Sequence, residues 1–155
     1  MKRLLLVLFT VIAAHAAQAK DLPNPDFTKG EPIPEGATHD WNLGPTGARG
    51  WMHSKGGENR EAKQILITKV AAGCPAEGVL AEGDVVLGVA GKNFLINPRE
   101  EIGRAITAAE AKDGKLALTR WRAGKSDEVV VPLRVLGSYS ATSPYDCPKS
   151  RTILD

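Results

Sequence analysis

The fold of this chain is decided by residues 65–91, which read Ile65-Leu66-Ile67-Thr68-Lys69-Val70-Ala71-Ala72-Gly73-Cys74-Pro75-Ala76-Glu77-Gly78-Val79-Leu80-Ala81-Glu82-Gly83-Asp84-Val85-Val86-Leu87-Gly88-Val89-Ala90-Gly91. The stretch opens with an apolar, β-branched run and closes with a second apolar run, and both runs are typical of strands. Between them, Gly73 and Pro75 favour a sharp change of direction, because glycine accepts positive φ and proline fits the first position of a helical turn. Gly83 and Asp84 suit a tight turn, since an Asp side chain accepts hydrogen bonds from nearby backbone amides. The stretch therefore predicts a strand, a corner with one short helical turn, and a second strand.

Residues 97–114 carry the start and stop signals of one helix. Asn97 is a good N-cap, Pro98 suits the first helical position, and Glu100 stands where it completes a capping box. Gly114 fits the position just after the helix end. The apolar stripe of the expected helix consists of Ile102, Ala105, Ile106 and Ala109. We therefore predict a helix over residues 98–112 with one buried face.

Alternating apolar residues predict further strands on both sides of these elements. The expected ranges are 37–43, 51–54, 115–122 and 128–136. In the first of them Trp41 and Leu43 share a face, and a glycine-rich loop leads from it to the second. Pro132 indicates that one edge of the last strand is not fully paired. Together these elements predict an α+β domain.

Two motifs in the central stretch resemble the signature of PDZ domains. Gly73-Cys74-Pro75-Ala76-Glu77-Gly78-Val79-Leu80 is similar to their Gly-Ser-Pro-Ala-x-x-x-Gly-Leu corner, with Cys74 at the usual serine. Residues 83–91 are similar to their Gly-Asp-x-Ile-x-x-Val-Asn-Gly turn, with Ala90 at the usual asparagine. The order of the expected elements from Trp41 to about Leu136 also agrees with the PDZ order. The resemblance implies a PDZ-like, partly open β-barrel or sandwich of about five to six strands, capped by one main helix and one short helix.

The resemblance also implies a peptide-binding groove. Residues 48–52 are similar to the glycine-rich PDZ loop whose amides receive the C-terminal carboxylate of a peptide, with Ala48 where a glycine is usual. In that mode an extended peptide adds as a strand alongside Trp51-Met52-His53-Ser54, opposite the expected helix. The floor of its apolar pocket would be Trp51, Ile102 and Ile106. The candidate peptide-binding residues are therefore Arg49, Gly50, Trp51, Met52, His53, Ile102 and Ile106. The alternative is that the loop is only a turn and the apolar residues form an ordinary core.

The N-terminus has the pattern of a signal peptide. Lys2 and Arg3 precede an apolar run from residue 4 to residue 14, and Ala17-Gln18-Ala19 fits the small-x-small pattern of a cleavage site. The apolar run is short for a membrane span, so an uncleaved anchor is the lesser alternative. We therefore expect residues 1–19 to be a signal peptide and the chain to be exported, to the periplasm or as a secreted protein.

The rest of the chain divides into three parts. Residues 20–40 are proline-rich, and we expect an extended leader across the surface or a flexible linker. Residues 41–137 form the expected PDZ-like domain. Residues 138–155 are expected to be a C-terminal tail, either frayed or a truncated junction to a further domain.

The chain has two cysteines, Cys74 and Cys147. In an oxidising compartment they either form a disulfide that ties the tail to the corner at Gly73, or remain two unpaired thiols. Their spacing leaves both alternatives open.

Charge and the remaining polar residues exclude several function classes. Lys plus Arg number 20 and Asp plus Glu 18, a formal net charge of +2 without a basic run, so neither nucleic acid nor an anionic membrane is an expected partner. His39 and His53 lack a second ligand at a metal-binding spacing, and the serines of the tail have no nearby base. We therefore expect no metal, no cofactor and no enzymatic activity. The leading hypothesis is an exported protein- or peptide-binding module that captures an extended segment, including a free C-terminus. The alternative is a regulatory or targeting PDZ domain of a larger exported hydrolase or protease whose catalytic part is absent from this chain.

Overall fold

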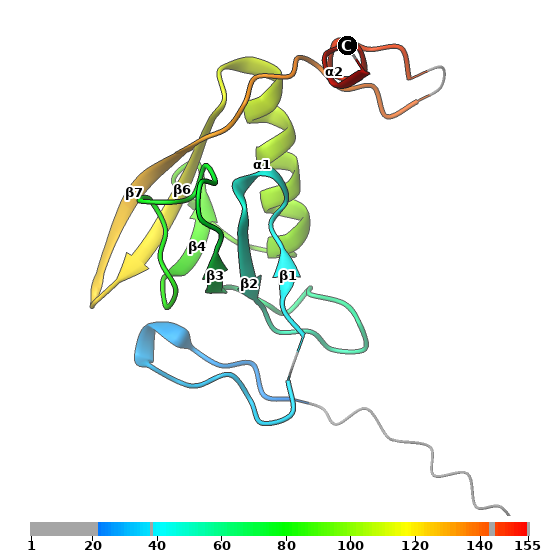
Figure 1. Ribbon diagram of the computed structural model, residues 1–155. Helices are drawn as coiled ribbons and strands as arrows, with labels where there is room; N and C mark the ends of the chain where they lie inside the picture. The colour runs from blue at the N-terminus through cyan, green and yellow to red at the C-terminus, as the bar shows by residue number, and fades with distance from the viewer. Residues whose placement is uncertain (1–21, 38, 143–144, 155) are drawn as a thin grey trace, which may run out of the picture.

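The computed structural model describes residues 22–37, 39–142 and 145–154, so the expected signal peptide lies outside the described residues. They form an α+β fold with one antiparallel sheet, in the order β1-β2-β3-β4-β6-β7, with β5 also paired to β4 (Figure 1). The strands are β1 Trp41–Asn42, β2 Ala48–Trp51, β3 Ile65–Val70, β4 Val85–Val89, β5 Lys92–Asn93, β6 Lys115–Arg122 and β7 Lys125–Pro132. The helices are α1 Pro98–Lys112 and α2 Pro148–Leu154, with two 3-10 turns, η1 Phe27–Lys29 and η2 Gly44–Thr46. The α+β class is confirmed, and the sheet has seven strands because the two-residue strands β1 and β5 join it.

Helix α1 has the predicted bounds. The Asn97 side chain accepts a hydrogen bond from the Arg99 amide, and Gly114 follows the helix with φ +71°. The predicted capping box is wrong in its acidic member. Glu101, not Glu100, reaches back to the preceding backbone, where one carboxylate oxygen accepts from the amides of Leu95 and Ile96, each at 3.0 Å.

The two faces of the sheet bury different clusters. On one face Ile102 and Ile106 of α1 pack against sheet residues such as Leu118. On the opposite face Trp51 packs against Phe27, with ring centroids 5.6 Å apart and planes at 90°. Residues 22–37 therefore lie packed along the second face of the sheet, and the Phe27 amide donates to the Gln64 side chain at 2.8 Å.

The corner between β3 and β4 is formed by turns in place of the expected short helix. One helical hydrogen bond is present, from the Leu80 amide to the Ala76 carbonyl at 2.8 Å. As the sequence predicts, Gly73 and Gly83 have positive φ, +73° and +89°. The Asp84 side chain accepts from the Ala81 amide at 2.8 Å, which is the turn bond expected of this residue.

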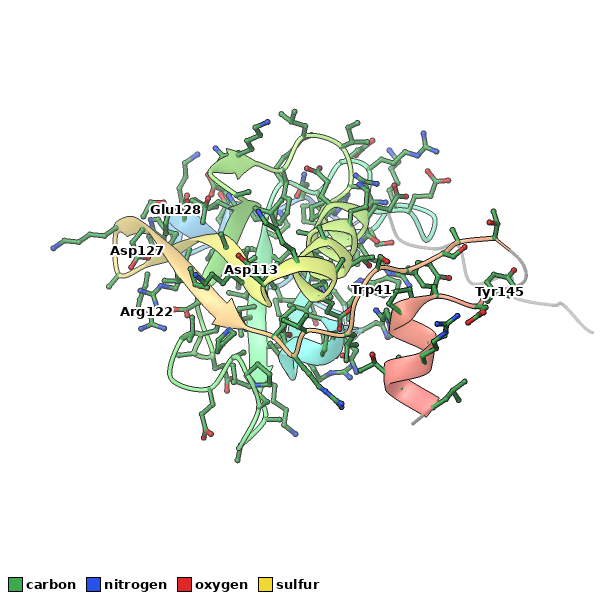
Figure 2. The ribbon with its side chains drawn as sticks, turned by 90° about the horizontal axis from the view of Figure 1, so that it is seen from above. Trp41, Asp113, Arg122, Asp127, Glu128 and Tyr145 are labelled. Atoms are coloured by element: carbon green, nitrogen blue, oxygen red, sulfur yellow. The ribbon has the colours of Figure 1, made fainter. Side chains whose placement is uncertain are left out.

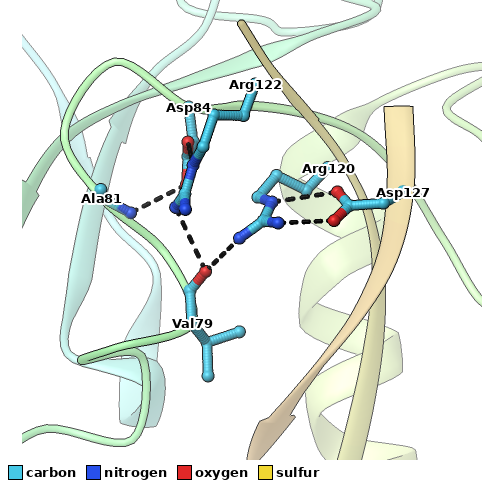
Figure 3. Close-up of polar contacts among 6 residues, drawn as sticks. All are labelled: Val79, Ala81, Asp84, Arg120, Arg122 and Asp127. Carbon is cyan, nitrogen blue, oxygen red and sulfur yellow. Dashed lines mark hydrogen bonds and ion pairs between the residues drawn. The ribbon is translucent and has the colours of Figure 1, made fainter. Parts of the chain in front are cut away.

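Two arginines of β6 hold this corner against the sheet (Figure 3). The Asp84 carboxylate, only 2% exposed, accepts two bonds from Arg122, Nε to Oδ1 at 2.6 Å and Nη2 to Oδ2 at 2.7 Å. Arg120 donates from Nη1 to the Val79 carbonyl at 2.6 Å. The Asp84 hydrogen bonds raise the pKa of Arg122 above its usual value. A charge-assisted pair thus fixes the connection that leads from β3 into β4.

Of the last two strands, β6 has the predicted bounds and β7 does not. The turn between them is shorter than expected, because Ala123 and Gly124 both have positive φ, +48° and +82°, and close a two-residue hairpin. β7 therefore begins earlier and ends at Pro132. The edge position that Pro132 indicated is confirmed, since β7 is the terminal strand of the sheet.

The C-terminal segment is held against the end of α1. The Glu110 carbonyl accepts from the amides of Leu136 and Gly137, at 2.8 and 3.0 Å. The buried Glu110 side chain forms an ion pair with Lys149 of α2. Figure 1 shows α2 beyond the end of α1, at the opposite end of the molecule from residues 22–37.

Candidate functional site

The expected binding edge of β2 is paired with a strand of the same chain. β1 runs antiparallel to β2, on the side away from β3. The aligned pairs are Trp41 with Gly50 and Asn42 with Arg49. One residue further, the Leu43 amide donates to the Ala48 carbonyl at 3.0 Å. The backbone of residues 41–43 therefore occupies the edge along which an added strand was expected.

The same segment also contacts α1. Leu43 is 4% exposed and belongs to the core cluster of Ile102 and Ile106. The Arg99 guanidinium of α1 lies 4.2 Å from the centroid of the Trp41 ring, and Trp41 appears beside α1 in Figure 2. Residues 41–43 thus lie between β2 and α1. We call this space the β2–α1 groove.

The amides of the loop between β1 and β2 donate hydrogen bonds to acceptors in the same part of the chain. The Gly44 amide donates to Asn42 Oδ1 at 2.8 Å and the Gly47 amide to the Gly44 carbonyl at 3.2 Å. The Ala48 amide donates to Thr46 Oγ1 at 3.1 Å. A peptide carboxylate at this loop would compete with these bonds, because each of the three amides already has an acceptor.

Arg49, a predicted binding residue, fastens the segment before β1. Its Nε donates to Asp40 Oδ1 at 2.8 Å, and Thr68 Oγ1 donates to Asp40 Oδ2 at 2.6 Å. The hydrogen bonds from Arg49 and then Thr68 hold the pKa of Asp40 below its usual value. The charge of Arg49 is thus paired within the chain.

Gly50 is required for packing. A Cβ added at this position would lie 2.4 Å from Cγ2 of Ile65, far inside van der Waals contact. Gly50 is also inside the ladder, opposite Trp41 of β1 and Ile67 of β3. The close approach of β3 is therefore a packing reason for glycine at this position.

The predicted pocket floor of Trp51, Ile102 and Ile106 is wrong. Successive side chains of a strand point to opposite faces. Trp51 therefore lies in the cluster with Phe27, whereas Ile102 and Ile106 lie in the cluster under α1. Met52, 1% exposed, belongs to the cluster under α1. The two isoleucines do share one cluster, and Leu43 belongs to it as well.

His53 is buried and lies beyond the end of β2. Its side chain is 4% exposed, Nδ1 has no hydrogen-bond partner, and Nε2 lies 3.9 Å from Glu61 Oε2. Its backbone carbonyl accepts from Asn59 Nδ2 at 2.8 Å. The strand expected over residues 51–54 is therefore wrong beyond Trp51, where the chain leaves the ladder.

An aromatic pocket opens where the leader separates from β2. It has a volume of about 370 Å³ and is mostly apolar. Its lining residues are Leu22, Gly36, Ala37, His39, Trp41, Trp51, Met52, Ser54 and Gly57. His39 and Trp41 pack edge to face with ring centroids 4.8 Å apart. Sequence reasoning placed Trp41 and Leu43 on one strand face but missed both as site residues, because a short alternating run does not show which strand it will pair with.

Both cysteines are free thiols in the structure. Cys74 lies against the β1–β2 loop, since a Cβ added at Gly47 would meet its side chain. Cys147 lies at the start of α2, where hydrogen bonding by Ser150 lowers the pKa of the thiol. The disulfide alternative is therefore not the one found.

Within residues 22–37, 39–142 and 145–154, no three His, Cys, Asp or Glu side chains are grouped to hold a metal ion. No helix in these ranges is both long and apolar enough to cross a membrane. The sequence matches no family model, and no curated protein is detectably similar to it.

Proposed function

We propose that this chain is an exported protein- or peptide-binding module with a PDZ-like β2–α1 groove that captures an extended segment by strand addition. One observation carries the proposal. Residues 41–43 lie antiparallel to β2 as an extended backbone, and the Leu43 side chain is buried in the core cluster that includes Ile102 and Ile106. The PDZ-like motifs at residues 73–80 and 83–91 support the same function.

Strand addition supplies affinity through backbone hydrogen bonds and specificity through alternate side chains. Over residues 48–50 an incoming segment would take the place of β1. β2 ends at Trp51, and the aromatic pocket is lined there by Trp51 and, just beyond the strand, by Met52 and Ser54. An extended segment longer than β1 would therefore place an apolar side chain in that pocket.

The proposed partner is a protein or peptide, reached after export to the periplasm or the exterior. The groove recognises shape and backbone, and the proposal includes no cofactor, nucleic acid or membrane contact and no catalysis. Lys2 and Arg3, followed by an apolar run, support export.

A binding screen tests the proposal. Purified protein is probed with a display library that presents both internal segments and free C-termini. Ser54→Trp fills the aromatic pocket beside the end of β2. Lys92→Trp, at an exposed residue of β5, is the matched control. We expect selected segments to bind the wild type and the control equally and to lose at least about tenfold in affinity with Ser54→Trp, since a blocked apolar pocket removes a side-chain anchor. Absence of any micromolar binder, among the internal segments and among the free C-termini alike, would contradict the proposal.

A second function is favoured by the exposed end of α2. Ile153 and Leu154 are 61% and 84% exposed, which is unusual for large apolar residues on a helix fixed to the domain. A contact between α2 and a catalytic part would cover them if the chain were the regulatory or targeting domain of a larger exported hydrolase or protease. Sequencing the gene beyond the codon of residue 155 decides this: an in-frame hydrolase domain supports it, and an immediate stop codon rejects it.

A further inference from the structure

The β2–α1 groove holds a segment of its own chain in the position proposed for a ligand. We infer that residues 41–43 are a resident ligand, and that the groove selects internal segments with an aromatic residue, a polar residue and leucine, followed by a tight turn. This inference rests on the proposed function, because it specifies the ligand class of the same groove.

Leucine is the principal anchor. Leu43 is 4% exposed and belongs to the same core cluster as Ile102 and Ile106 of α1. A Cβ added at Gly50 would lie 3.5 Å from Cδ1 of Leu43, so the leucine reaches into the space that this glycine leaves. A smaller side chain at this position would leave a cavity, and a polar one would be buried without a partner.

The aromatic residue two positions earlier is the second anchor. Trp41 points to the same side of β1 as Leu43, as alternation requires. Its ring lies under the Arg99 guanidinium at 4.2 Å and against His39. A cation over an aromatic face is attracted by the ring quadrupole, and tryptophan is the best ring for it. Asn42, between the anchors, is exposed and its identity matters mainly for the turn that follows.

The groove ends in a turn and not at a carboxylate. The Leu43 carbonyl accepts a hydrogen bond from Thr46 Oγ1 at 2.9 Å, and Asn42 Oδ1 accepts from the Gly44 amide. The chain then continues through Gly44–Thr46 into β2. A ligand that copies this geometry is an internal segment, because the position of a terminal carboxylate is taken by a continuing peptide bond.

The resident segment is short, which makes exchange measurable. The β1–β2 ladder has only two aligned pairs, and the aromatic pocket already separates the leader from β2. A free ligand can bind only those molecules in which the resident segment has left the groove. Its apparent Kd is therefore its Kd for an empty groove divided by the fraction of molecules with an empty groove. For a minor state populated at about 0.1–10%, a free copy of the segment binds about ten- to 1,000-fold more weakly than it would to an empty groove.

A reversible lock tests the inference in one molecule. Asn42 and Arg49 are directly opposed between two hydrogen-bonded positions, a placement in which Cα atoms lie close enough for a disulfide. The variant is Asn42→Cys with Arg49→Cys, in full-length protein that also carries Cys74→Ser and Cys147→Ser. The probe is a fluorescein-labelled, acetylated and amidated peptide that copies residues 39–46, and binding is read by fluorescence anisotropy.

We expect no binding to the oxidised variant, whose β1 cannot leave. After reduction, the same variant should bind at least about tenfold more tightly than the wild type, because Arg49→Cys removes the bond that fastens Asp40. Leu43→Ala should open the groove in the same direction. If circular dichroism shows that Leu43→Ala does not fold, Asp40→Ala takes its place, because it leaves the core unchanged. This variant should also bind the peptide more tightly than the wild type.

Three results would overturn the inference: equal binding by the oxidised and reduced forms, no binding by folded variants in which β1 is loosened, or tighter binding of a peptide that ends in a free carboxylate at the leucine. The outcome is separable from that of the proposed function. Binding of the 39–46 peptide without any library binder would support a resident ligand and reject capture of other proteins. Library binders whose affinity is the same for the oxidised and the reduced variant would support capture of other proteins and reject the resident ligand.

Discussion

The ion pair between Asp84 and Arg122 leads to a quantitative prediction. The Asp84 side chain is 2% exposed and receives two bonds from Arg122 and one from the Ala81 amide. Arg122→Ala leaves the carboxylate buried with a single neutral donor, and loss of one partner from a buried pair costs about 3–5 kcal/mol of unfolding free energy. Asp84→Asn keeps the shape and an acceptor for Ala81, and the Arg122 side chain, 44% exposed, remains hydrated. This second change should cost about 1.5–3 kcal/mol, the value of hydrogen bonds to a charged group.

The stability of the double variant relative to Arg122→Ala is the most direct test of this reasoning. Asp84→Asn in the Arg122→Ala background removes the stranded charge, so the double variant should be more stable than Arg122→Ala alone. Urea unfolding at pH 7, followed by tryptophan fluorescence, measures all three variants. Arg104→Ala is the control, because its ion pair with Glu100 is exposed on both sides, and we expect a change within about 0.5 kcal/mol. A loss below about 1 kcal/mol for Arg122→Ala, or a double variant less stable than it, would refute the reasoning.

Three further predictions concern the β1 anchor, a strained turn and the tail. Arg49 lowers the folded-state pKa of Asp40. This carboxylate therefore stabilises the fold above its unfolded pKa of about 3.9 and loses that contribution as pH falls through the lower folded value. Asp40→Asn should reduce the difference in urea midpoint between pH 7 and pH 3. Ala90 has φ +50° and an exposed side chain, so Ala90→Gly should raise the unfolding free energy by about 1 kcal/mol in urea. Lys149→Ala leaves the buried Glu110 carboxylate without its ion-pair partner and should make residues 138–142 more sensitive to limited proteolysis.

Each of these predictions has a matched control. Asn93→Ala, at an exposed and uncharged residue of β5, should leave the acid dependence unchanged. Ala81→Gly, exposed and without positive φ, should lower stability where Ala90→Gly raises it. Lys92→Ala should leave the proteolysis pattern as in the wild type. The opposite order in any of these pairs would show that the named contact is not the cause.

Local signals in the sequence predicted the elements whose determinants are local. The bounds of α1 follow from Asn97, Pro98 and Gly114, each of which acts on its own neighbours. β3 and β4 were found from two β-branched runs. The packing of Phe27 on Trp51 was missed because the two residues lie in segments with no common period, and only the folded sheet brings them together.

The candidate site was predicted in part for the same reason. The face of Trp51 depends on where β2 begins, and the start of the strand at Ala48 instead of Trp51 is decided by pairing with β1 and β3. Ile102 and Ile106 were correctly placed on the buried stripe of α1. That Leu43 joins their cluster follows from the pairing of β1 with β2, a long-range arrangement that no spacing in the sequence records.

The two edges of the sheet differ in how readily they could pair with a strand of another molecule. At one end, β7 exposes Asp127 and Glu128 and closes with Pro132, and charges and proline on an edge strand discourage pairing with another chain. At the other end, β1 is two residues long and covers β2 only in part. Any intermolecular β-assembly of this protein therefore has a polarity: it would start from the β1 end, and crowded or partly unfolded molecules would exchange β1 segments there before they stacked through β7.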